Sequence, residues 1–339
     1  MNWLALDIGG ANLKMANGQG FADSRAFALY RDPHQLAQEL RTFIAEAPAC
    51  DRLVCTMTGE LADCFASKAD GVNHILQAVI EAADGRHTRI YLTTGALVTP
   101  QVAKTRPLRA AASNWHALAR YVGRSLPKGV GLLVDIGSTT TDIIPLVEGV
   151  PAAKGTTDTQ RLLNYELVYT GVERSPVCAI APSVQYRGQE CPLAQEFFAT
   201  TKDVYVILQD LPEEATNVST ADGKPATKVA ARARLGRSIC ADSEEFNHRD
   251  AMLMAQNLAD AQVDRVAAAI RHVVDQMPSP PTVIFISGHG EFVASRAIAR
   301  AQIHANIRSL SKELSPGVSR CATAHALAVL AREASAGPA

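Results

Sequence analysis

The sequence has no excess of one charge and no long apolar run. Its 339 residues include 33 Lys and Arg and 34 Asp and Glu, so the formal net charge is −1. Proteins that bind nucleic acid or membrane surfaces through bulk charge are usually more basic, so we expect neither partner. No run of about 18 apolar residues is present, which argues against a membrane-spanning helix.

Paired cysteines and an export signal are also missing. The seven cysteines are scattered with no Cys-x-x-Cys pair, which disfavours a zinc site and a disulfide framework. The first residues lack a basic leader, and their apolar run reaches Asp7 within a few positions, unlike a signal peptide. We therefore expect a cytoplasmic protein whose cysteines are reduced and mostly buried.

The length and the hydrophobic content, 47% of residues, suffice for two domains with full cores. A strand–turn–strand pattern over 2–29 begins again near 130, so we expect domains at 1–127 and 128–334. The second holds an irregular insertion at about 156–245, and whether the C-terminal helix packs back on the first domain is left open. Buried strands are predicted at 52–57, 89–94 and 282–290, and helices at 32–44, 114–126, 248–277, 291–301 and 321–334.

One motif occurs twice. Asp7-Ile8-Gly9 and Asp135-Ile136-Gly137 lie 128 positions apart, and each ends an apolar run that leads into a second strand. A carboxylate at the end of a buried strand is costly to desolvate unless something pairs with it. Glycine lets a ligand approach the backbone, and successive amides in such a turn can bind an anion. One copy alone is also typical of an ordinary tight hairpin, but the duplication favours a phosphate site.

The residues after each motif strengthen this interpretation. The first hairpin continues with Gly10, Asn12 and Lys14, which offer donors and a cation; the second continues with Ser138, Thr139, Thr140, Thr141 and Asp142. A third turn, Gly288-His289-Gly290, follows a predicted buried strand and precedes a helix, where ligands often meet a parallel sheet. We predict that the hairpins face each other across a cleft and that Asp7 and Asp135 hold one Mg²⁺ between them.

The paired hairpins and the late glycine turn resemble the superfamily of actin, sugar kinases and heat-shock chaperones. This resemblance implies an α/β fold of two ribonuclease-H-like (actin-like ATPase) domains facing a central cleft, which hold a phosphorylated ligand with Mg²⁺. The segment 155–177 resembles the hydantoinase A/oxoprolinase branch. It departs from the branch at Tyr165, where Gly is usual, and at Ser175, where Thr is usual.

Further motifs resemble one subgroup of that branch, linked to tetrahydromethanopterin-dependent one-carbon metabolism: DIGGANLK, TMTGELADCF, AASNWHALA, DIGSTTTDIIP and TADGKPAT. The resemblance implies a transferase that couples an aminomethylfuran-methyl diphosphate to a (γ-glutamyl)tyramine phenol and releases pyrophosphate, in methanofuran or methylofuran biosynthesis. It implies small-molecule diphosphate and phenolic amine substrates. The residue patterns themselves make Asp7, Asp135, Glu60 and Asp63 the catalytic candidates. A homodimer is left open.

The segment after the strand at 52–57 holds Thr58, Gly59, Glu60 and Asp63. Glu60 and Asp63 are three positions apart at a predicted helix start, so we expect them to share one face, and we expect one or the other to contact substrate, Mg²⁺ or an ammonium group. The alternative is capping, in which Thr58 begins the helix and the two acids stabilise its first turn.

Two other segments carry candidates. Asn114 and Trp115 are predicted to contact the furan or tyramine ring; the alternative is a capping Asn and a core Trp. Arg161, Glu166 and Arg174 lie in the branch-specific segment, where a guanidinium could meet a carboxylate or a diphosphate. A structural salt-bridge network is the alternative. Weaker candidates in the insertion are Asp203, Asp222 and Arg234.

Two other functions compete with the transferase. An ATP-dependent small-molecule kinase or an oxoprolinase-like amidohydrolase would use ATP as a cofactor and form ADP. A non-catalytic nucleotide-binding regulator of the same fold would bind nucleotide without turnover.

Overall fold

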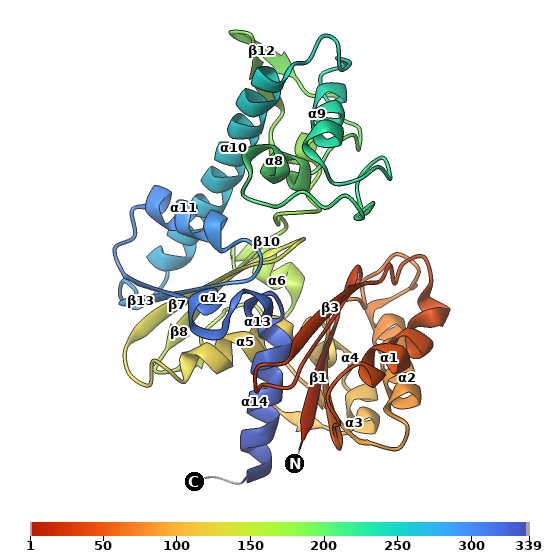
Figure 1. Cartoon of the computed structure of the whole chain (residues 1–339). Coiled ribbons are helices and arrows are strands. Elements are labelled where there is room, and N and C mark those ends of the chain that lie inside the picture. Colours follow the sequence, from red (N-terminus) through yellow and green to blue (C-terminus); the bar gives the residue numbers. More distant parts are fainter. Residues whose placement is uncertain (1, 337–339) are drawn as a thin grey trace.

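The computed structural model describes residues 2–336, arranged as two sheet-based domains side by side and a lobe above them (Figure 1). The first sheet has the order β3-β2-β1-β4-β5-β6, and β1 is parallel to β4 and antiparallel to β2. Its strands are β1 (Trp3–Ile8), β2 (Asn12–Ala16), β3 (Ala22–Ala26), β4 (Arg52–Met57), β5 (His87–Tyr91) and β6 (Leu97–Val98).

The second sheet repeats this plan with the order β10-β8-β7-β13-β14. Its strands are β7 (Val130–Ile136), β8 (Thr141–Val147), β10 (Leu167–Val168), β13 (Val283–Ser287) and β14 (Asn306–Ser309), and β9 (Val150–Pro151) pairs with β8. In both sheets a hairpin starts the domain and its first strand pairs in parallel with a later strand. The duplicated motif is therefore part of a duplicated architecture.

All six residues of β1 are buried because helices cover both faces of the first sheet. On one face, Leu4, Leu6 and Ile8 pack with α1 (Leu36–Ala45) and α2 (Lys68–Ala83). On the other face, Trp3 and Ala5 pack with α5 (Asn114–Gly123) and α14 (Ala322–Ala336). Short helical segments η1 (Pro33–Gln35), α3 (Pro100–Lys104) and α4 (Pro107–Ala110) complete this domain.

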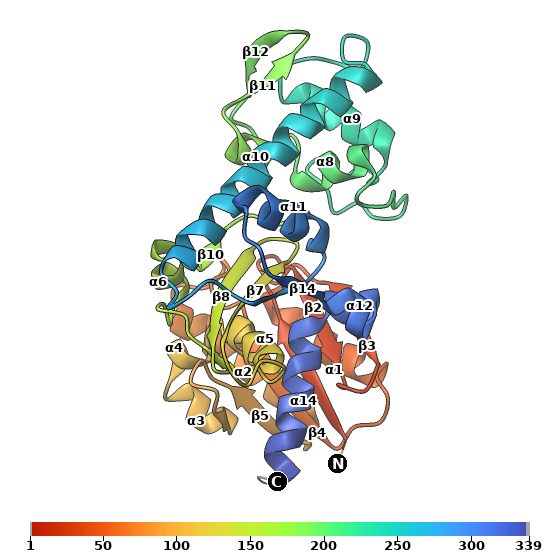
Figure 2. The same ribbon diagram turned by 90° about the vertical axis from the view of Figure 1, so that its left-hand side faces the viewer.

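Helices α5 and α14 lie between the two sheets. Leu327 and Ala117 contact the core of the first sheet, whereas Leu118 and Ala326 contact Leu133 and the core of the second. The C-terminal helix thus packs on β1, β2 and β4 as well as on α5 (Figure 2). The other face of the second sheet is covered by α10 (His248–Asp275) and α11 (Glu291–Ala301), with α12 (Leu310–Leu314) and α13 (Pro316–Arg320) after β14.

The lobe is built from α7 (Val177–Ile180), β11 (Ser183–Tyr186), β12 (Gln189–Pro192), α8 (Thr201–Leu208) and α9 (Lys228–Arg237), with the upper part of α10. It begins later than the expected insertion at 156, because α6 (Asp158–Leu163) and β10 belong to the second domain, where β10 pairs with β8. Helix α10 starts at a capping box formed by Asn247 and Asp250 and runs from the lobe to the sheets (Figure 2).

Most predicted elements are confirmed, including the two hairpins, the buried strands and the long helix. The predicted helix start at Thr58 is wrong: residues 58–67 form turns, and Ser67 caps α2. All seven cysteines are free, but only Cys55 and Cys321 are buried, so the expectation of mostly buried thiols is also wrong. Within residues 2–336, no helix combines the length and apolar character that a bilayer crossing requires.

Candidate functional site

The two motif aspartates face the space between the sheets. Side chains alternate along a strand, so Asp7 lies on the same face of β1 as Trp3 and Ala5, toward α5 and α14. Asp135 lies on the same face of β7 as Leu133, which packs in the cluster formed with these helices. The fold therefore directs both carboxylates into the interdomain layer.

The Asp7 and Asp135 carboxylates lack hydrogen-bond donors that would offset the cost of their burial. The Oδ1 atoms of Asp7 and Asp135 are buried and have no hydrogen-bond partner. Burial raises the pKa of Asp7 to about 6, although Lys14 opposes the shift. Burial, reinforced by the nearby Asp142, raises the pKa of Asp135 to about 6 as well. Buried oxygens that lack a donor are suited to a hard cation such as Mg²⁺.

The two turns are built alike. The Gly9 amide donates to the Asn12 carbonyl at 3.0 Å, and the Gly137 amide donates to the Thr140 carbonyl at 2.9 Å. Another glycine packs against each turn: a Cβ at Gly59 would lie 3.1 Å from the Gly9 carbonyl carbon, and one at Gly171 would lie 2.4 Å from the Thr139 amide nitrogen. The backbone at both turns is therefore closely packed, and at the second turn the packing leaves room only for glycine.

The hairpins differ in charge at matching positions. Lys14 pairs with Asp7 across the first hairpin, and Asp142 pairs with Asp135 across the second. Asp142 is neutralised by a buried ion pair with Arg161, whose guanidinium lies 4.4 Å from the Trp115 ring. The first hairpin thus brings a cation to the interdomain layer, whereas the second brings a neutral ion pair.

The hydroxyl run of the second hairpin divides in two. Ser138, Thr139 and Thr140 are partly exposed in the turn. The buried Thr141 donates its hydroxyl to the Thr170 carbonyl at 2.8 Å. The first three hydroxyls thus remain the candidates for a ligand, and Thr141 ties β8 to the following segment.

Glu60 and Asp63 lie in different environments, so the expected shared helical face is wrong. Both are in the turns before α2; Glu60 is 1% exposed and Asp63 is exposed. The Oε2 atom of Glu60 has no hydrogen-bond partner. Burial, with a further contribution from Asp158, raises the pKa of Glu60 to about 7. Of the two acids, only Glu60 has the properties of a buried functional carboxyl group.

The branch-specific residues make mainly structural contacts. Arg161 also donates to the Glu166 carbonyl at 3.2 Å, and the Glu166 carboxylate accepts the Gly155 amide at 2.9 Å. The Asn114 side chain accepts the Trp115 amide at 2.8 Å, and Trp115 is buried under Arg161. Arg174 is exposed. Ligand contact by any of these residues stays a prediction.

The third turn packs directly against Asp135. Gly288 has a φ of 86°, and a Cβ there would lie 2.7 Å from Asp135 Oδ1. The Gly290 amide donates to the Ile136 carbonyl at 2.8 Å. Between them, His289 Nδ1 lies 2.7 Å from Glu173. The turn therefore places His289 beside the second hairpin.

Sequence reasoning missed the partners of His289. Glu173 also pairs with Lys202 of α8 at 2.8 Å, and Arg320 approaches His289 Nε2 at 3.3 Å. Glu173 lies inside the recognised segment 155–177, which was a usable signal. No sequence pattern connects positions 173, 202, 289 and 320, because only the fold brings them together.

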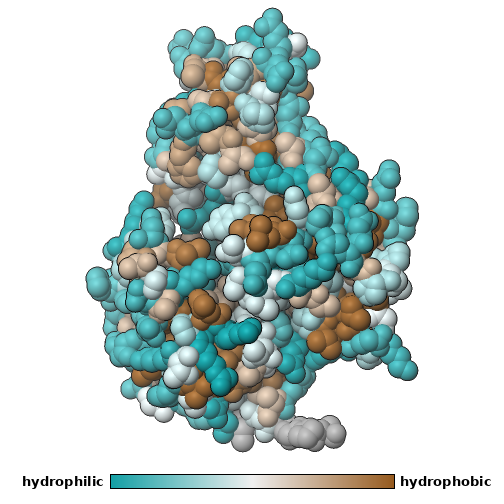
Figure 3. All heavy atoms as spheres, turned by 180° about the vertical axis from the view of Figure 1, so that it is seen from behind, coloured by the Kyte–Doolittle hydropathy of each residue, from teal (hydrophilic) through white to brown (hydrophobic). Residues whose placement is uncertain are grey.

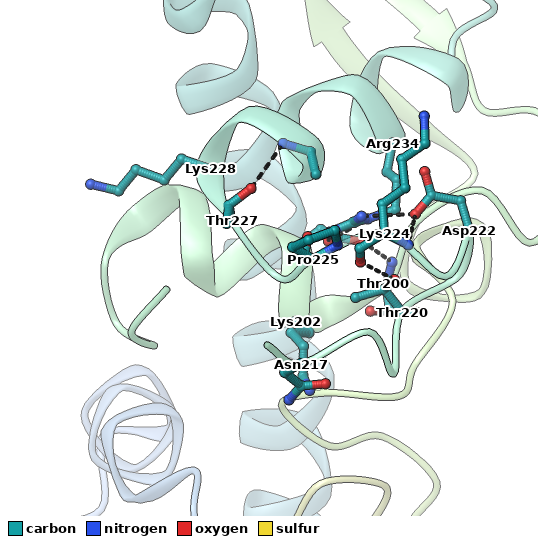
Figure 4. A network of polar contacts seen from close by, with 12 residues as sticks. Thr200, Lys202, Asn217, Thr220, Asp222, Lys224, Pro225, Thr227, Lys228 and Arg234 are labelled. Carbon is teal, nitrogen blue, oxygen red and sulfur yellow. Dashed lines mark hydrogen bonds and ion pairs between the residues drawn. The ribbon is translucent and has the colours of Figure 1, made fainter. Parts of the chain in front are cut away.

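The insertion candidates Asp203, Asp222 and Arg234 form a structural network, and Figure 4 shows Asp222 beside Arg234. Arg234 is fully buried and donates to Asp203 at 2.8 Å through Nε and to Asp222 at 2.9 Å. It thereby fixes the 220–227 loop onto α8. The lobe stands above the carboxyl end of β1 (Figure 1), and a hollow separates it from the first domain on the surface seen in Figure 3.

The protein has the actin-like ATPase fold. Its two sheets share one strand order, each begins with a hairpin, and helices α5 and α14 pack between them. Among solved structures, the PilM-PilN type IV pilus biogenesis complex matches with a TM-score of 0.50 at 14% identity, covering 97% of this chain and 98% of that chain. That likeness concerns the fold alone.

Residues 52–334 match the Hydantoinase/oxoprolinase family, and the chain belongs to this family. A (4-{4-[2-(gamma-L-glutamylamino)ethyl]phenoxymethyl}furan-2-yl)methanamine synthase from Methanocaldococcus jannaschii is 32% identical over 319 residues, 92% of this chain and 93% of the relative. A synthase of the same name from Methanococcus vannielii is 31% identical over 181 residues, 53% of this chain and 80% of the relative. The predicted fold class and family resemblance are confirmed.

Proposed function

We propose that the protein is a transferase that couples an aminomethylfuran-methyl diphosphate to the phenol of a (γ-glutamyl)tyramine and releases pyrophosphate, in methanofuran or methylofuran biosynthesis. The observation that carries the proposal is the 32% identity to the named synthase over 92% of the chain. The paired hairpins at Asp7–Lys14 and Asp135–Asp142 support it, because a phosphate-binding site formed by both, here called the diphosphate grip, can hold a substrate that carries its own diphosphate.

The diphosphate would lie between the two hairpins. The turn amides after Gly9 and Gly137 and the Lys14 ammonium supply donors and positive charge for its oxygens. Asp7 and Asp135 would hold Mg²⁺, and their unpartnered Oδ1 atoms fit that role. Within residues 2–336 no group of three His, Cys, Asp or Glu side chains could hold a metal, so the two carboxylates would share the ion with ligand oxygens. When bound, Mg²⁺ would neutralise charge on the diphosphate.

The reaction breaks the bond between the furan methylene carbon and the diphosphate oxygen, and the electron pair leaves with pyrophosphate. The electron-rich furan ring delocalises the positive charge that develops on the carbon. The phenol oxygen then bonds to this carbon and its proton must go to a base. The chain's residues position both substrates, stabilise the leaving charge and exclude water.

The test is to incubate purified protein with Mg²⁺, the furan diphosphate and tyramine or its γ-glutamyl derivative, without ATP. We expect pyrophosphate and the ether product in equal amounts. The Asp63→Asn variant is a matched control for Asp7→Asn, because it makes the same substitution at an exposed carboxylate in the turns before α2. Wild-type rates in both Asp7→Asn and Asp135→Asn would contradict the paired-aspartate grip.

The family name favours a second candidate, ATP-dependent opening of a cyclic amide. With a hydantoin or oxoproline substrate, this second activity would form ADP from ATP. It would form no ether product from the furan diphosphate. Nucleotide binding without any turnover would instead indicate a regulator of this fold.

A further inference from the structure

Glu173 is the centre of a charged cluster beside the candidate site. Its carboxylate lies 2.8 Å from Lys202 Nζ and 2.7 Å from His289 Nδ1. Arg320 lies 3.8 Å from Glu173 and 3.3 Å from His289 Nε2. These four side chains come from the segment after β10, from α8, from the turn after β13 and from the end of α13. Three separate parts of the chain thus converge on the Glu173 carboxylate, and His289 and Arg320 also contact each other.

The contacts define the protonation pattern of His289. Although burial opposes it, hydrogen bonds from His289 and Lys202 hold the pKa of Glu173 well below its usual range. An ionised carboxylate only accepts hydrogen bonds, so His289 Nδ1 carries a proton. Arg320 only donates, so Nε2 faces it with a lone pair. These contacts therefore favour the tautomer that carries its proton on Nδ1 and leaves a lone pair on Nε2.

The backbone segments that carry the other two cations of the cluster, Lys202 and Arg320, are anchored by further contacts. Lys202, labelled in Figure 4, precedes Asp203 in α8, and Asp203 is fixed by an ion pair with the buried Arg234. Arg320 follows Ser319, whose hydroxyl donates to the Glu291 carboxylate at 3.0 Å. The same carboxylate accepts the Ser311 amide at 2.8 Å, which joins α11 to α12 and α13. The orientation of His289 is thus built into the fold.

His289 also remains reachable from solvent. Its side chain is 23% exposed, and Arg320, which covers Nε2, is 44% exposed. The preceding residue Gly288 abuts the Asp135 carboxylate. A base at this position lies next to the proposed diphosphate grip, and an anionic ligand would attract Arg320 away from Nε2.

We propose that His289 is the general base of the transfer, with Glu173 as its positioning residue and Arg320 covering Nε2 until the diphosphate binds. The proposal rests on the proposed function. As the phenol oxygen bonds to the furan methylene carbon, its proton passes to His289 Nε2, and the pair of electrons of the breaking carbon–oxygen bond leaves with pyrophosphate. The Glu173 carboxylate stabilises the imidazolium that forms, as in other base–orienter pairs.

The test compares tyramine with a ring-fluorinated tyramine whose phenol is more acidic. We expect His289→Ala to lower kcat for tyramine by about 10²- to 10⁴-fold, with little change in KM for the furan diphosphate. The loss should shrink with the fluorinated acceptor, because a more acidic phenol needs less help from a base. His304→Ala removes an exposed histidine of the same domain and should retain the wild-type rate.

Glu173→Gln gives a second and independent readout. It should lower kcat by about tenfold or more with the same dependence on the acceptor, and Glu173→Asp should recover part of the loss. The general-base role alone would be overturned if the wild type is active and His289→Ala is unimpaired. It would also be overturned if His289→Ala loses kcat equally with both acceptors. A wild type that forms no ether product would instead overturn the proposed function and this role with it.

Discussion

Replacing Asp7 by asparagine should stabilise the ligand-free protein while abolishing the proposed transfer. Burial raises the pKa of Asp7 from 3.8 to about 6, so ionisation of this carboxylate costs folding free energy at neutral pH. At ~1.36 kcal/mol per unit, the cost is up to ~3 kcal/mol above pH 6. An amide of nearly the same shape avoids it. For a chain of this length that unfolds as one unit, the melting temperature should rise by about 4 °C at pH 8.

The pH dependence tests the cause. The native state binds the Asp7 proton more tightly than the unfolded state, so wild-type stability falls as pH rises from about 4 to about 6. The advantage of Asp7→Asn should therefore be full at pH 8, about half as large at pH 5 and absent near pH 3. Thermal unfolding followed by circular dichroism, with Asp63→Asn as the exposed control, measures this. A variant less stable than wild type at pH 8, or an effect independent of pH, would refute the reasoning.

Two further changes test the surroundings of the site. Arg161→Met should lower the free energy of unfolding by about 3–5 kcal/mol, because it leaves the buried Asp142 carboxylate without its partner. Denaturant unfolding should show that the double variant Arg161→Met/Asp142→Leu recovers much of this lost stability. No recovery would argue that the ion pair is not the cause of the loss. Gly171→Ala should lower the melting temperature, since its Cβ would lie 2.4 Å from the Thr139 nitrogen, whereas Gly137→Ala has 3.7 Å to the nearest atom and should not. Equal melting temperatures in the two glycine variants would contradict the close packing at the second turn.

The hairpins could be predicted because their signal is local and duplicated. An apolar run that ends in Asp7-Ile8-Gly9 contains both the strand and its turn, and the copy at Asp135 identifies the second domain. The alternation that places Lys14 and Asp142 on the inner faces also follows from strand periodicity. Periodicity could not predict that the inner faces of both sheets pack against the same two helices, α5 and α14.

Other features depend on long-range contacts that no local pattern encodes. Glu60 and Asp63 have helical spacing, but the chain forms turns until Ser67, so spacing alone misplaced them. The cluster around Glu173 joins residues separated by up to 147 positions, from 173 to 320. Arg161 gives another example: the sequence marks it as a ligand candidate, and only the fold shows that it also neutralises the buried Asp142.

The proposed function requires that the two hairpins together form one diphosphate-binding site. Isothermal titration of the protein with inorganic pyrophosphate in the presence of Mg²⁺ tests it most directly. We expect one site per chain and a large loss of affinity in both Asp7→Asn and Asp135→Asn, with Asp63→Asn binding as the wild type does. Two independent sites per chain, or full affinity in either motif variant, would contradict it.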